Sequence, residues 1–378
     1  MRTKDGRATA EIPVGRIFKK SWHAFLILFL WLMAYTTQLA ARPQAGEPPV
    51  TDANIAAFMA AWQAYADETN ALPRQEGCRP EFMASTPNVA RKGAVVMFHG
   101  FGGCPQQFFE LGRLVSAHGF DVMLPLLPGH GAARQPGGQD DLLRLPTAGD
   151  GEARYTGLAR RMNEIMALSP DSKVIVGFSL GGAVSFNANM QAPALYDRQL
   201  LLSPMFAIRG GAFVEGLAGF FGRLPGVRNI IVKPASKRRE CRDWASAGRA
   251  GFCDYRLKHV VALLNLEEMN RQMYRESAFT TPVQIVAAGD EDYVSNGQIE
   301  TFAERQAENG PISLCFMPAD VPHEMLSPYE NSDVAMYWLR ELLGHSVSFI
   351  ADSNFFPQRS VAPEDTTDKS ECRIRAPD

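Results

Sequence analysis

Residues 173–182 read KVIVGFSLGG, an apolar run that ends in a serine flanked by glycines. The run predicts a buried strand, and the residues from Leu180 onward predict a helix. A serine hydroxyl is a weak nucleophile unless it is exposed on a rigid turn and loses its proton as it attacks. A sharp strand–turn–helix elbow, with small residues at Gly177 and Gly181, presents Ser179 in this way. Ser179 is therefore the predicted nucleophile.

The alternation of apolar and amphipathic stretches continues on both sides of this motif. Further strands are predicted at about 94–99, 122–127, 200–203, 283–288 and 312–317, and helices at 152–168 and 333–343. Apolar strands that alternate with amphipathic helices predict an α/β fold, a mostly parallel sheet with helices on both faces. We assign residues 91–203 and 278–350 to this core.

The alternation is interrupted between residues 204 and 277, a glycine-rich stretch with several phenylalanines and a basic cluster. It is predicted to be an inserted cap, placed after the strand that follows the nucleophile helix. Its apolar segment AFVEGLAGFFGRL (212–224) has two interpretations, a surface for lipid-like acyl chains or the core of the cap itself.

A base and an orienting acid are expected after the serine, in the chain order Ser, Asp or Glu, His. His323 lies in PADVPHEML (318–326), past a strand end, where catalytic residues of this architecture gather. The segment AAGDEDYVS (287–295) offers Asp290, Glu291 and Asp292 as the acid that fixes the imidazole tautomer. A G-x-x-D pattern favours Asp292, with Asp290 as the alternative.

The motif FHGFGG (98–103) follows the first predicted core strand. A tetrahedral intermediate needs N–H donors where its negative charge develops, and the backbone N–H groups of Phe101 and Leu180 are the natural pair. His99 and His130 lie in glycine-containing turns and are expected to form hydrogen bonds with loop backbone.

The N-terminus predicts a targeting segment. Residues 1–20 are rich in Lys and Arg, and residues 21–41, with the centre FLILFLWLMAY, contain no Asp, Glu, Lys or Arg. About 20 apolar residues can cross a bilayer, and the basic flank stays cytoplasmic. A retained anchor and a cleaved signal peptide both fit, and both place the catalytic domain on the non-cytoplasmic side. Residues 42–90 are predicted to be a linker with a short helix outside the core, and residues 351–378 a disordered polar tail.

Six cysteines agree with an oxidising compartment. Two disulfides are plausible, Cys78–Cys104 and Cys241–Cys253, whereas Cys315 and Cys372 are expected to be unpaired. The formal net charge of −3 gives no general attraction to nucleic acid. The sequence shows no zinc-type spacing of Cys and His and no P-loop.

The chain resembles the lid-bearing α/β-hydrolases, which include bacterial carboxylesterases and monoacylglycerol lipases and are grouped with the serine aminopeptidases. The resemblance extends over about 92–343 and rests on HGFGGCPQQF, PLLPGHG, GFSLGG, GDEDYV and PHEML, in this order. It implies a triad of Ser179, Asp292 and His323, oxyanion donors at Phe101 and Leu180, and no metal or organic cofactor. The long N-terminal part, the cysteines and the larger cap depart from the family pattern and leave the substrate class open.

The expected function is that of a carboxylesterase or lipase, which cleaves small esters of lipid-like or short acyl chains through an acyl-enzyme on Ser179. Amide or peptide hydrolysis by the same triad is an alternative. A non-catalytic, membrane-tethered binding module is another, because a fold alone does not establish activity. The filled triad positions disfavour the binding module. The oligomeric state does not follow from the sequence.

Overall fold

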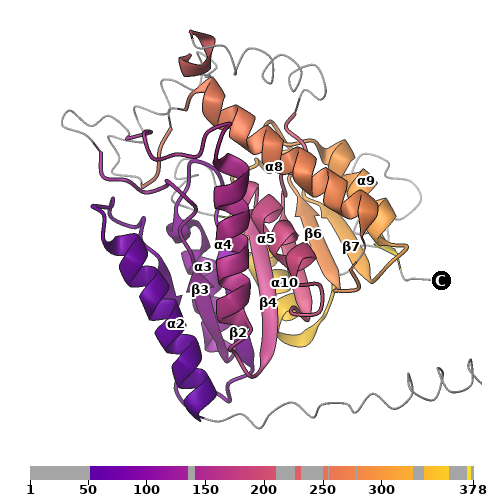
Figure 1. Cartoon of the computed structure of the whole chain (residues 1–378). Helices are drawn as coiled ribbons and strands as arrows, with labels where there is room; N and C mark the ends of the chain where they lie inside the picture. The colour runs from indigo at the N-terminus through magenta and orange to yellow at the C-terminus, as the bar shows by residue number, and fades with distance from the viewer. Residues whose placement is uncertain are drawn as a thin grey trace, which may run out of the picture. The chain divides into compact units, whose positions relative to one another are not determined.

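The computed structural model describes residues 52–134, 141–209, 226–230, 250–253, 255–277, 279–326, 336–356 and 373–375. An eight-stranded sheet with the strand order β1-β3-β2-β4-β5-β6-β7-β8 forms its centre (Figure 1). Strands β2 to β7 are parallel, and the edge strands β1 and β8 are antiparallel to their neighbours. The predicted mostly parallel sheet is confirmed.

The strands are β1 (Glu81–Met83), β2 (Gly93–Phe98), β3 (Phe120–Leu124), β4 (Ser172–Phe178), β5 (Arg198–Leu202), β6 (Val283–Ala287), β7 (Ile312–Phe316) and β8 (Arg373–Arg375). The α-helices are α2 (Asp52–Asn70), α3 (Phe109–Ala117), α4 (Gly151–Met166), α5 (Leu180–Gln191), α8 (Leu257–Glu276), α9 (Asn296–Gln306) and α10 (Leu339–Asp352). Two short 3₁₀ helices, η1 (Pro105–Phe108) and η2 (Val227–Asn229), complete the described elements.

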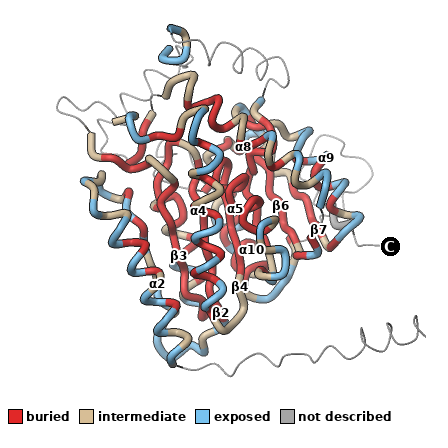
Figure 2. The backbone as a smooth tube through the Cα atoms, in the orientation of Figure 1, coloured by how far each residue is buried: buried red, intermediate tan, exposed pale blue. Residues whose placement is uncertain are grey.

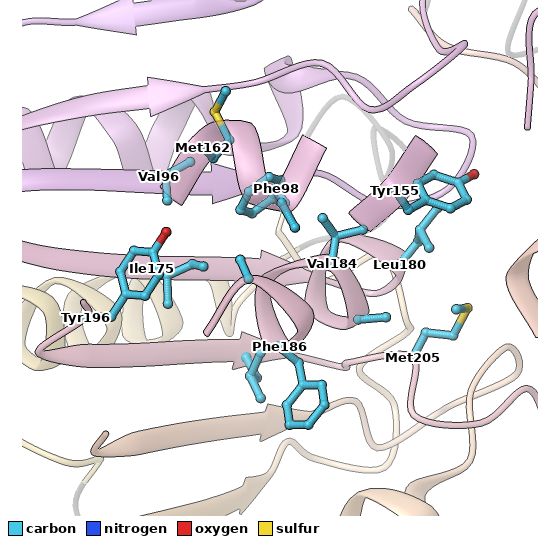
Figure 3. Packing of buried hydrophobic residues seen from close by; sticks show 14 of the residues in the cluster. Val96, Phe98, Tyr155, Met162, Ile175, Leu180, Val184, Phe186, Tyr196 and Met205 are labelled. Atoms are coloured by element: carbon cyan, nitrogen blue, oxygen red, sulfur yellow. The ribbon is translucent and has the colours of Figure 1, made fainter. Parts of the chain in front are cut away.

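Helices cover both faces of the sheet, so the central strands are buried on both sides (Figure 2). Alternate residues of β2 enter different hydrophobic clusters: Val96 and Phe98 pack with α2, α4, α5, α8 and α9, whereas Val95 and Met97 pack with α3 and α10. Figure 3 shows the first cluster, in which Phe98 lies among side chains of α4 and α5. This two-sided burial explains the continuous apolar runs of the parallel strands.

Helix α2 packs against the core, contrary to the prediction that it lies outside. Phe58, Trp62 and Tyr65 are buried in the first cluster, and Phe58 and Trp62 contact the ring of Phe82. The Tyr65 hydroxyl forms hydrogen bonds with the backbone O and N of Leu126 at 3.2 and 3.1 Å. These three aromatic residues are spaced four and three apart, so they share one face of the helix, which the sheet domain covers.

Helix α8 occupies the C-terminal part of the predicted cap, yet it belongs to the layer that covers the sheet. Leu263 and Leu266 are buried in the first cluster. The Asn270 amide Nδ2 donates to the backbone O of Ala183, at 2.9 Å, and thereby joins α8 to α5. Residues 210–225 and 231–249 of the predicted cap lie outside the described residues, and the cap remains a prediction.

The last core helix and the tail also differ from prediction. α10 ends nine residues beyond the predicted helix, because Val347, Phe349 and Ile350 continue its buried face. Beyond it, Phe356 is buried, and its backbone N–H donates to Gln284 Oε1 at 3.0 Å. β8 pairs with β7, so the predicted disordered tail contains ordered parts.

Cys78 and Cys104 form the predicted disulfide. Cys253 is disulfide-bonded as well. The prediction that Cys315 is unpaired is wrong, since this cysteine, in β7, is also disulfide-bonded. Cys241 and Cys372 lie outside the described residues.

The predicted targeting segment, 1–20 and 21–41, lies outside the described residues too. Within the described ranges, none of the helices combines the length and the apolar character needed to span a bilayer.

Candidate active site

Ser179 lies at the sharp turn between β4 and α5, as predicted. Its φ of 54° and ψ of −119° are unusual for a residue with a side chain, and such strain concentrates at functional sites. The flanking glycines allow the turn. A Cβ at Gly177 would lie 2.3 Å from the carbonyl oxygen of Gly181, and a Cβ at Gly181 only 1.9 Å from that of Phe98. The elbow therefore needs both glycines.

The structure brings His323 to Ser179 across 144 sequence positions, with Nε2 of the imidazole 2.9 Å from the serine Oγ. Both residues are more than 90% buried, with 8% of Ser179 and 6% of His323 exposed. The imidazole contacts the rings of Phe178 and Tyr293, with centroid distances of 5.0 and 5.1 Å. A base within hydrogen-bond distance of a hydroxyl is the arrangement that activates a serine.

Glu291 lies on the other side of the imidazole. His323 Nδ1 donates to Glu291 Oε2 at 2.7 Å. The second carboxylate oxygen, Oε1, accepts hydrogen bonds from the backbone N–H groups of Tyr293 and Val294 at 2.8 and 3.1 Å. Because Nδ1 bonds Glu291, the imidazole is oriented so that Nε2 faces the Oγ of Ser179 and can accept its proton.

Glu291 is held in its charged form despite its burial. Burial raises the pKa of the carboxyl, but the hydrogen bond to His323, the charge of His323 and the two backbone donors outweigh it, so the pKa lies below its usual value. A carboxylate that remains charged in this position can stabilise an imidazolium on His323.

The prediction that Asp292 is the orienting acid is contradicted by this geometry. The Asp292 side chain is 61% exposed and forms an ion pair with Arg209 at 2.8 Å. Asp290, the alternative, is exposed as well. After β6 the backbone turns so that the middle of the three acidic residues faces inward, and the longer side chain of Glu291 reaches the imidazole. The chain order Ser, Asp or Glu, His admits a glutamate, but pattern matching favoured an aspartate.

The loop that carries Phe101 lies beside the elbow. A Cβ at Gly100 would be 3.4 Å from the Cβ of Ser179. The buried side chain of Gln107 accepts the Gly100 N–H on Oε1 at 2.8 Å. The backbone N–H groups of Phe101 and Leu180 have no acceptor within the described part of the chain, so they are available to a ligand.

The two loop histidines contact backbone groups, as predicted. His99 accepts the Leu127 N–H on Nε2 at 3.0 Å, and its Nδ1 donates to the Gly100 carbonyl at 2.9 Å. His130 Nδ1 lies 3.1 Å from the Pro128 carbonyl. Burial lowers the pKa of His99 to about 4 and that of His130 well below its usual value, so both are neutral near pH 7.

Within the described ranges, no group of three or more His, Cys, Asp or Glu side chains could hold a metal ion. The arrangement at Ser179 suits nucleophilic attack on a carbonyl group, with a base at His323 and N–H donors at Phe101 and Leu180.

Comparisons with known proteins agree with the fold. The family model described as alpha/beta hydrolase fold matches residues 93–312, more than half of the chain. The monoacylglycerol lipase of Paleococcus ferrophilus is 15% identical, with a TM-score of 0.53 over 73% of this chain and 98% of that one. A soluble variant of the Saccharomyces cerevisiae monoglyceride lipase is 12% identical, with a TM-score of 0.54 over 74% and 92%. No curated protein matches the chain in sequence.

Proposed function

We propose that this chain, which belongs to the alpha/beta hydrolase family, hydrolyses small carboxylic esters with Ser179 as its nucleophile. The observation that carries the proposal is the continuous line of hydrogen bonds from Ser179 through His323 to Glu291. A serine, an imidazole and a buried carboxylate in this order form the unit that activates a serine for acylation by its substrate.

In the first half of the reaction, Ser179 Oγ attacks the ester carbonyl carbon while its proton passes to His323 Nε2. The carbonyl electron pair moves to the oxygen, and the N–H groups of Phe101 and Leu180 stabilise the resulting oxyanion. The tetrahedral intermediate collapses, the bond to the alcohol oxygen breaks, and the imidazolium returns the proton to the departing alcohol. An acyl-enzyme on Ser179 remains.

In the second half, His323 takes a proton from a water molecule that attacks the acyl carbon. The second tetrahedral intermediate collapses, the bond between the acyl carbon and Ser179 Oγ breaks, the imidazolium of His323 returns the proton to Oγ, and the carboxylic acid leaves. Glu291 stabilises the positive charge on His323 in both halves, since its two oxygens are held by the imidazole and by backbone donors.

An apolar acyl group fits the surroundings of the oxyanion loop. The Phe101 ring contacts the rings of Phe252 and Tyr255, at 5.1 and 5.3 Å, so that aromatic surface adjoins the residue whose N–H binds the carbonyl oxygen. The two lipases with a similar fold act on monoacylglycerols, as their names state. We therefore propose monoacyl esters of lipid-like chains as the substrate class.

A fluorophosphonate probe tests the nucleophile. We expect it to label the wild-type chain and to leave Ser179→Ala unlabelled. Absence of labelling in the folded wild type would favour a binding module. Turnover of p-nitrophenyl butyrate should exceed that of the matching p-nitroanilide. Faster anilide cleavage would point to an amidase.

The location of the enzyme is part of the proposal. Residues 21–41 would attach or direct the catalytic domain to the non-cytoplasmic side, and the disulfide-bonded Cys78, Cys104, Cys253 and Cys315 agree with an oxidising compartment. Protease digestion before and after permeabilisation of the membrane that residues 21–41 would reach tests it, because a domain on the non-cytoplasmic side is cleaved without that permeabilisation.

A further inference from the structure

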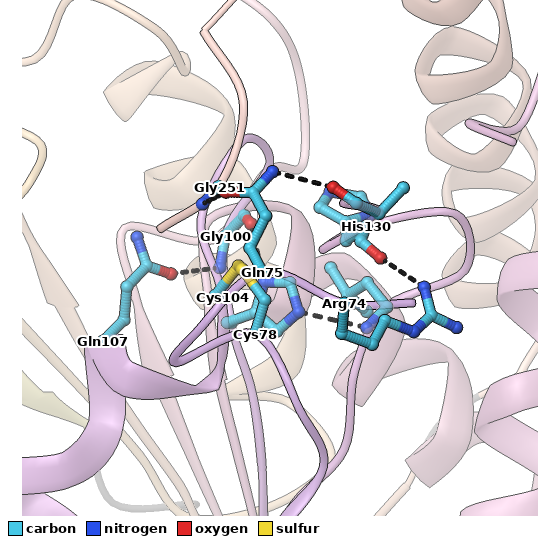
Figure 4. Close-up of a disulfide and its surroundings, with 11 residues drawn as sticks. Arg74, Gln75, Cys78, Gly100, Cys104, Gln107, His130 and Gly251 are labelled. Atoms are coloured by element: carbon cyan, nitrogen blue, oxygen red, sulfur yellow. Dashed lines mark hydrogen bonds between the residues drawn. A yellow bond between two sulfur atoms is a disulfide. The ribbon is translucent and has the colours of Figure 1, made fainter. Parts of the chain in front are cut away.

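The segment from Arg74 to Cys78, termed the 74–78 clamp, contacts three other segments of the chain at once (Figure 4). Its cysteine is bonded to Cys104, the last residue of the loop HGFGGC. Arg74 Nη1 donates to the backbone O of His130 at 2.9 Å. The clamp thus joins the loop that carries Phe101 to the turn that contains His130.

Gln75 extends these contacts to a third segment, which contains Gly251 and Phe252. Its backbone N–H donates to the carbonyl oxygen of Gly131 at 3.0 Å, and its Nε2 donates to that of Ala132 at 2.9 Å. Its Oε1 accepts the Gly251 N–H at 3.1 Å. The Gln75 side chain therefore links residue 132 with residue 251, which lies far away in sequence.

The third segment in turn contacts the oxyanion loop. The Phe252 N–H donates to the Gly102 carbonyl at 2.9 Å, and the Phe252 ring packs on the ring of Phe101. The His130 ring contacts Phe101 from the second loop, at 5.7 Å. Two of the rings that contact Phe101, those of His130 and Phe252, thus belong to segments bonded to the clamp, and the disulfide holds the backbone three residues after Phe101.

These contacts leave little room for movement. A Cβ at Gly251 would lie 2.1 Å from the Gly102 carbonyl oxygen, and one at Gly131 would lie 2.6 Å from the Cβ of Cys78. Both sulfur-bearing residues are fully buried, with Ala250 packed against them. Because interiors this tightly packed transmit displacements, a shift of the clamp shifts the oxyanion loop.

We propose that the 74–78 clamp positions the Phe101 N–H for the oxyanion, so that Cys78, Cys104 and Gln75 determine the turnover rate without contacting the substrate. The inference rests on the proposed ester hydrolysis. A misplacement of about 1 Å can cost about 10²-fold in rate, and loss of one oxyanion donor about 10²- to 10³-fold. The clamp residues are positioning residues.

The experiment uses two variants of the full chain, Cys78→Ala/Cys104→Ala and Gln75→Leu. The control is Gln63→Leu, which changes an exposed glutamine of α2 whose side chain donates to Asp67 on the same helix. Folded enzyme is counted by stoichiometric fluorophosphonate labelling. The kcat and KM for p-nitrophenyl butyrate and the Ki of an alkyl trifluoromethyl ketone, whose serine adduct places an oxyanion in the same hole, are then measured.

We expect kcat per labelled site to fall about 10- to 100-fold in both variants, with KM changed by less than about threefold. The Ki of the ketone should rise by a factor similar to the loss in kcat. The control should resemble the wild type. If the double variant does not fold, Gln75→Leu, which retains the disulfide, decides the matter.

A wild-type kcat per labelled site in the folded variants would overturn the positioning role of the clamp. An unchanged Ki of the ketone would overturn it as well. In both cases the clamp would be purely structural, because such a role lowers only the amount of folded enzyme. A wild-type chain that neither reacts with the probe nor turns over ester would instead refute the proposed function itself. The two failures are therefore distinguishable.

Discussion

Glu291 Oε2 lies 2.7 Å from His323 Nδ1, although the two residues belong to loops after different strands, 32 positions apart. β6 and β7 are parallel neighbours, so the loops that follow them meet at the same edge of the sheet. The isolated bridge between Asp290 and Pro322 and the hydrogen bond from the Asp290 N–H to the Val321 carbonyl join the two loops next to this pair.

Substitution of the two adjacent acids should affect kcat to very different extents. Glu291→Gln removes the charge that stabilises the His323 imidazolium, so we expect kcat to fall by about 10²- to 10⁴-fold. Asp292→Asn affects an exposed ion pair and should change kcat by less than about twofold. Steady-state kinetics of both variants with one ester check the assignment. A large loss of kcat in Asp292→Asn, together with a wild-type kcat in Glu291→Gln, would show that Asp292 is the orienting acid.

Replacement of His323 by Ala should lower kcat by about 10³-fold or more, because Ser179 loses its proton acceptor. His118→Ala is the matched control, since this exposed histidine follows α3 and its ring Nδ1 bonds the Leu114 carbonyl of that helix. Single-turnover release of p-nitrophenol measures the acylation step directly. Equal rates in the two variants would exclude His323 as the base.

The glycines of the elbow and of α4 should respond differently to a methyl group. Gly181→Ala places a Cβ 1.9 Å from the Phe98 carbonyl oxygen, so we expect a loss of folded protein and of labelling at Ser179. Gly157→Ala, within α4, meets nothing within 4 Å and should stabilise the chain by about 0.5 to 1 kcal/mol. Urea unfolding measures the stability of both variants, and fluorophosphonate labelling measures the reactivity of Ser179. A Gly181→Ala variant as stable and active as the wild type would contradict the crowding at the elbow.

The buried His99 should make stability depend on pH. Its pKa is lowered to about 4 by burial, against about 6.5 in an unfolded chain. Between these values the unfolded state binds more protons, so the free energy of unfolding should decrease as the pH falls through this window, by roughly 1.4 kcal/mol per pH unit. Stability from this residue is complete above pH 6.5.

His99→Gln should reduce that slope, since the amide does not titrate. Urea unfolding at several pH values between 4 and 7 measures it for both proteins. If the unfolding free energy depended on pH identically in the wild type and the variant, burial would not lower the pKa of His99.

Helix α2 should contribute to stability as part of the core. Phe58 is fully buried, and Phe58→Ala is expected to lower the free energy of unfolding by about 3 to 5 kcal/mol. Met59, the next residue, is 37% exposed, and Met59→Ala should cost well under 1 kcal/mol. Thermal or urea unfolding compares the two variants. Equally small losses of unfolding free energy in the two variants would show that α2 does not belong to the core.

Local patterns in the sequence were sufficient for the parallel strands β2 to β7, for α4 and for the elbow at Ser179. Continuous apolar runs predict strands that are covered on both faces, and the glycines around Ser179 predict a tight turn wherever that turn lies in space. The same local logic identified His323 as the base candidate and the Cys78–Cys104 pair.

Tertiary structure decided what local patterns leave open. The helical faces of α2 and α8 do not state what covers them, and the state of Cys315 depends on distant parts of the chain. The sequence determined that an acid follows β6, but three consecutive acidic residues share that place. Only the folded turn, which directs the Glu291 carboxylate inward to His323 and Asp292 outward to Arg209, selects one, because a side chain's direction is set by backbone torsions and by the loop packed against it.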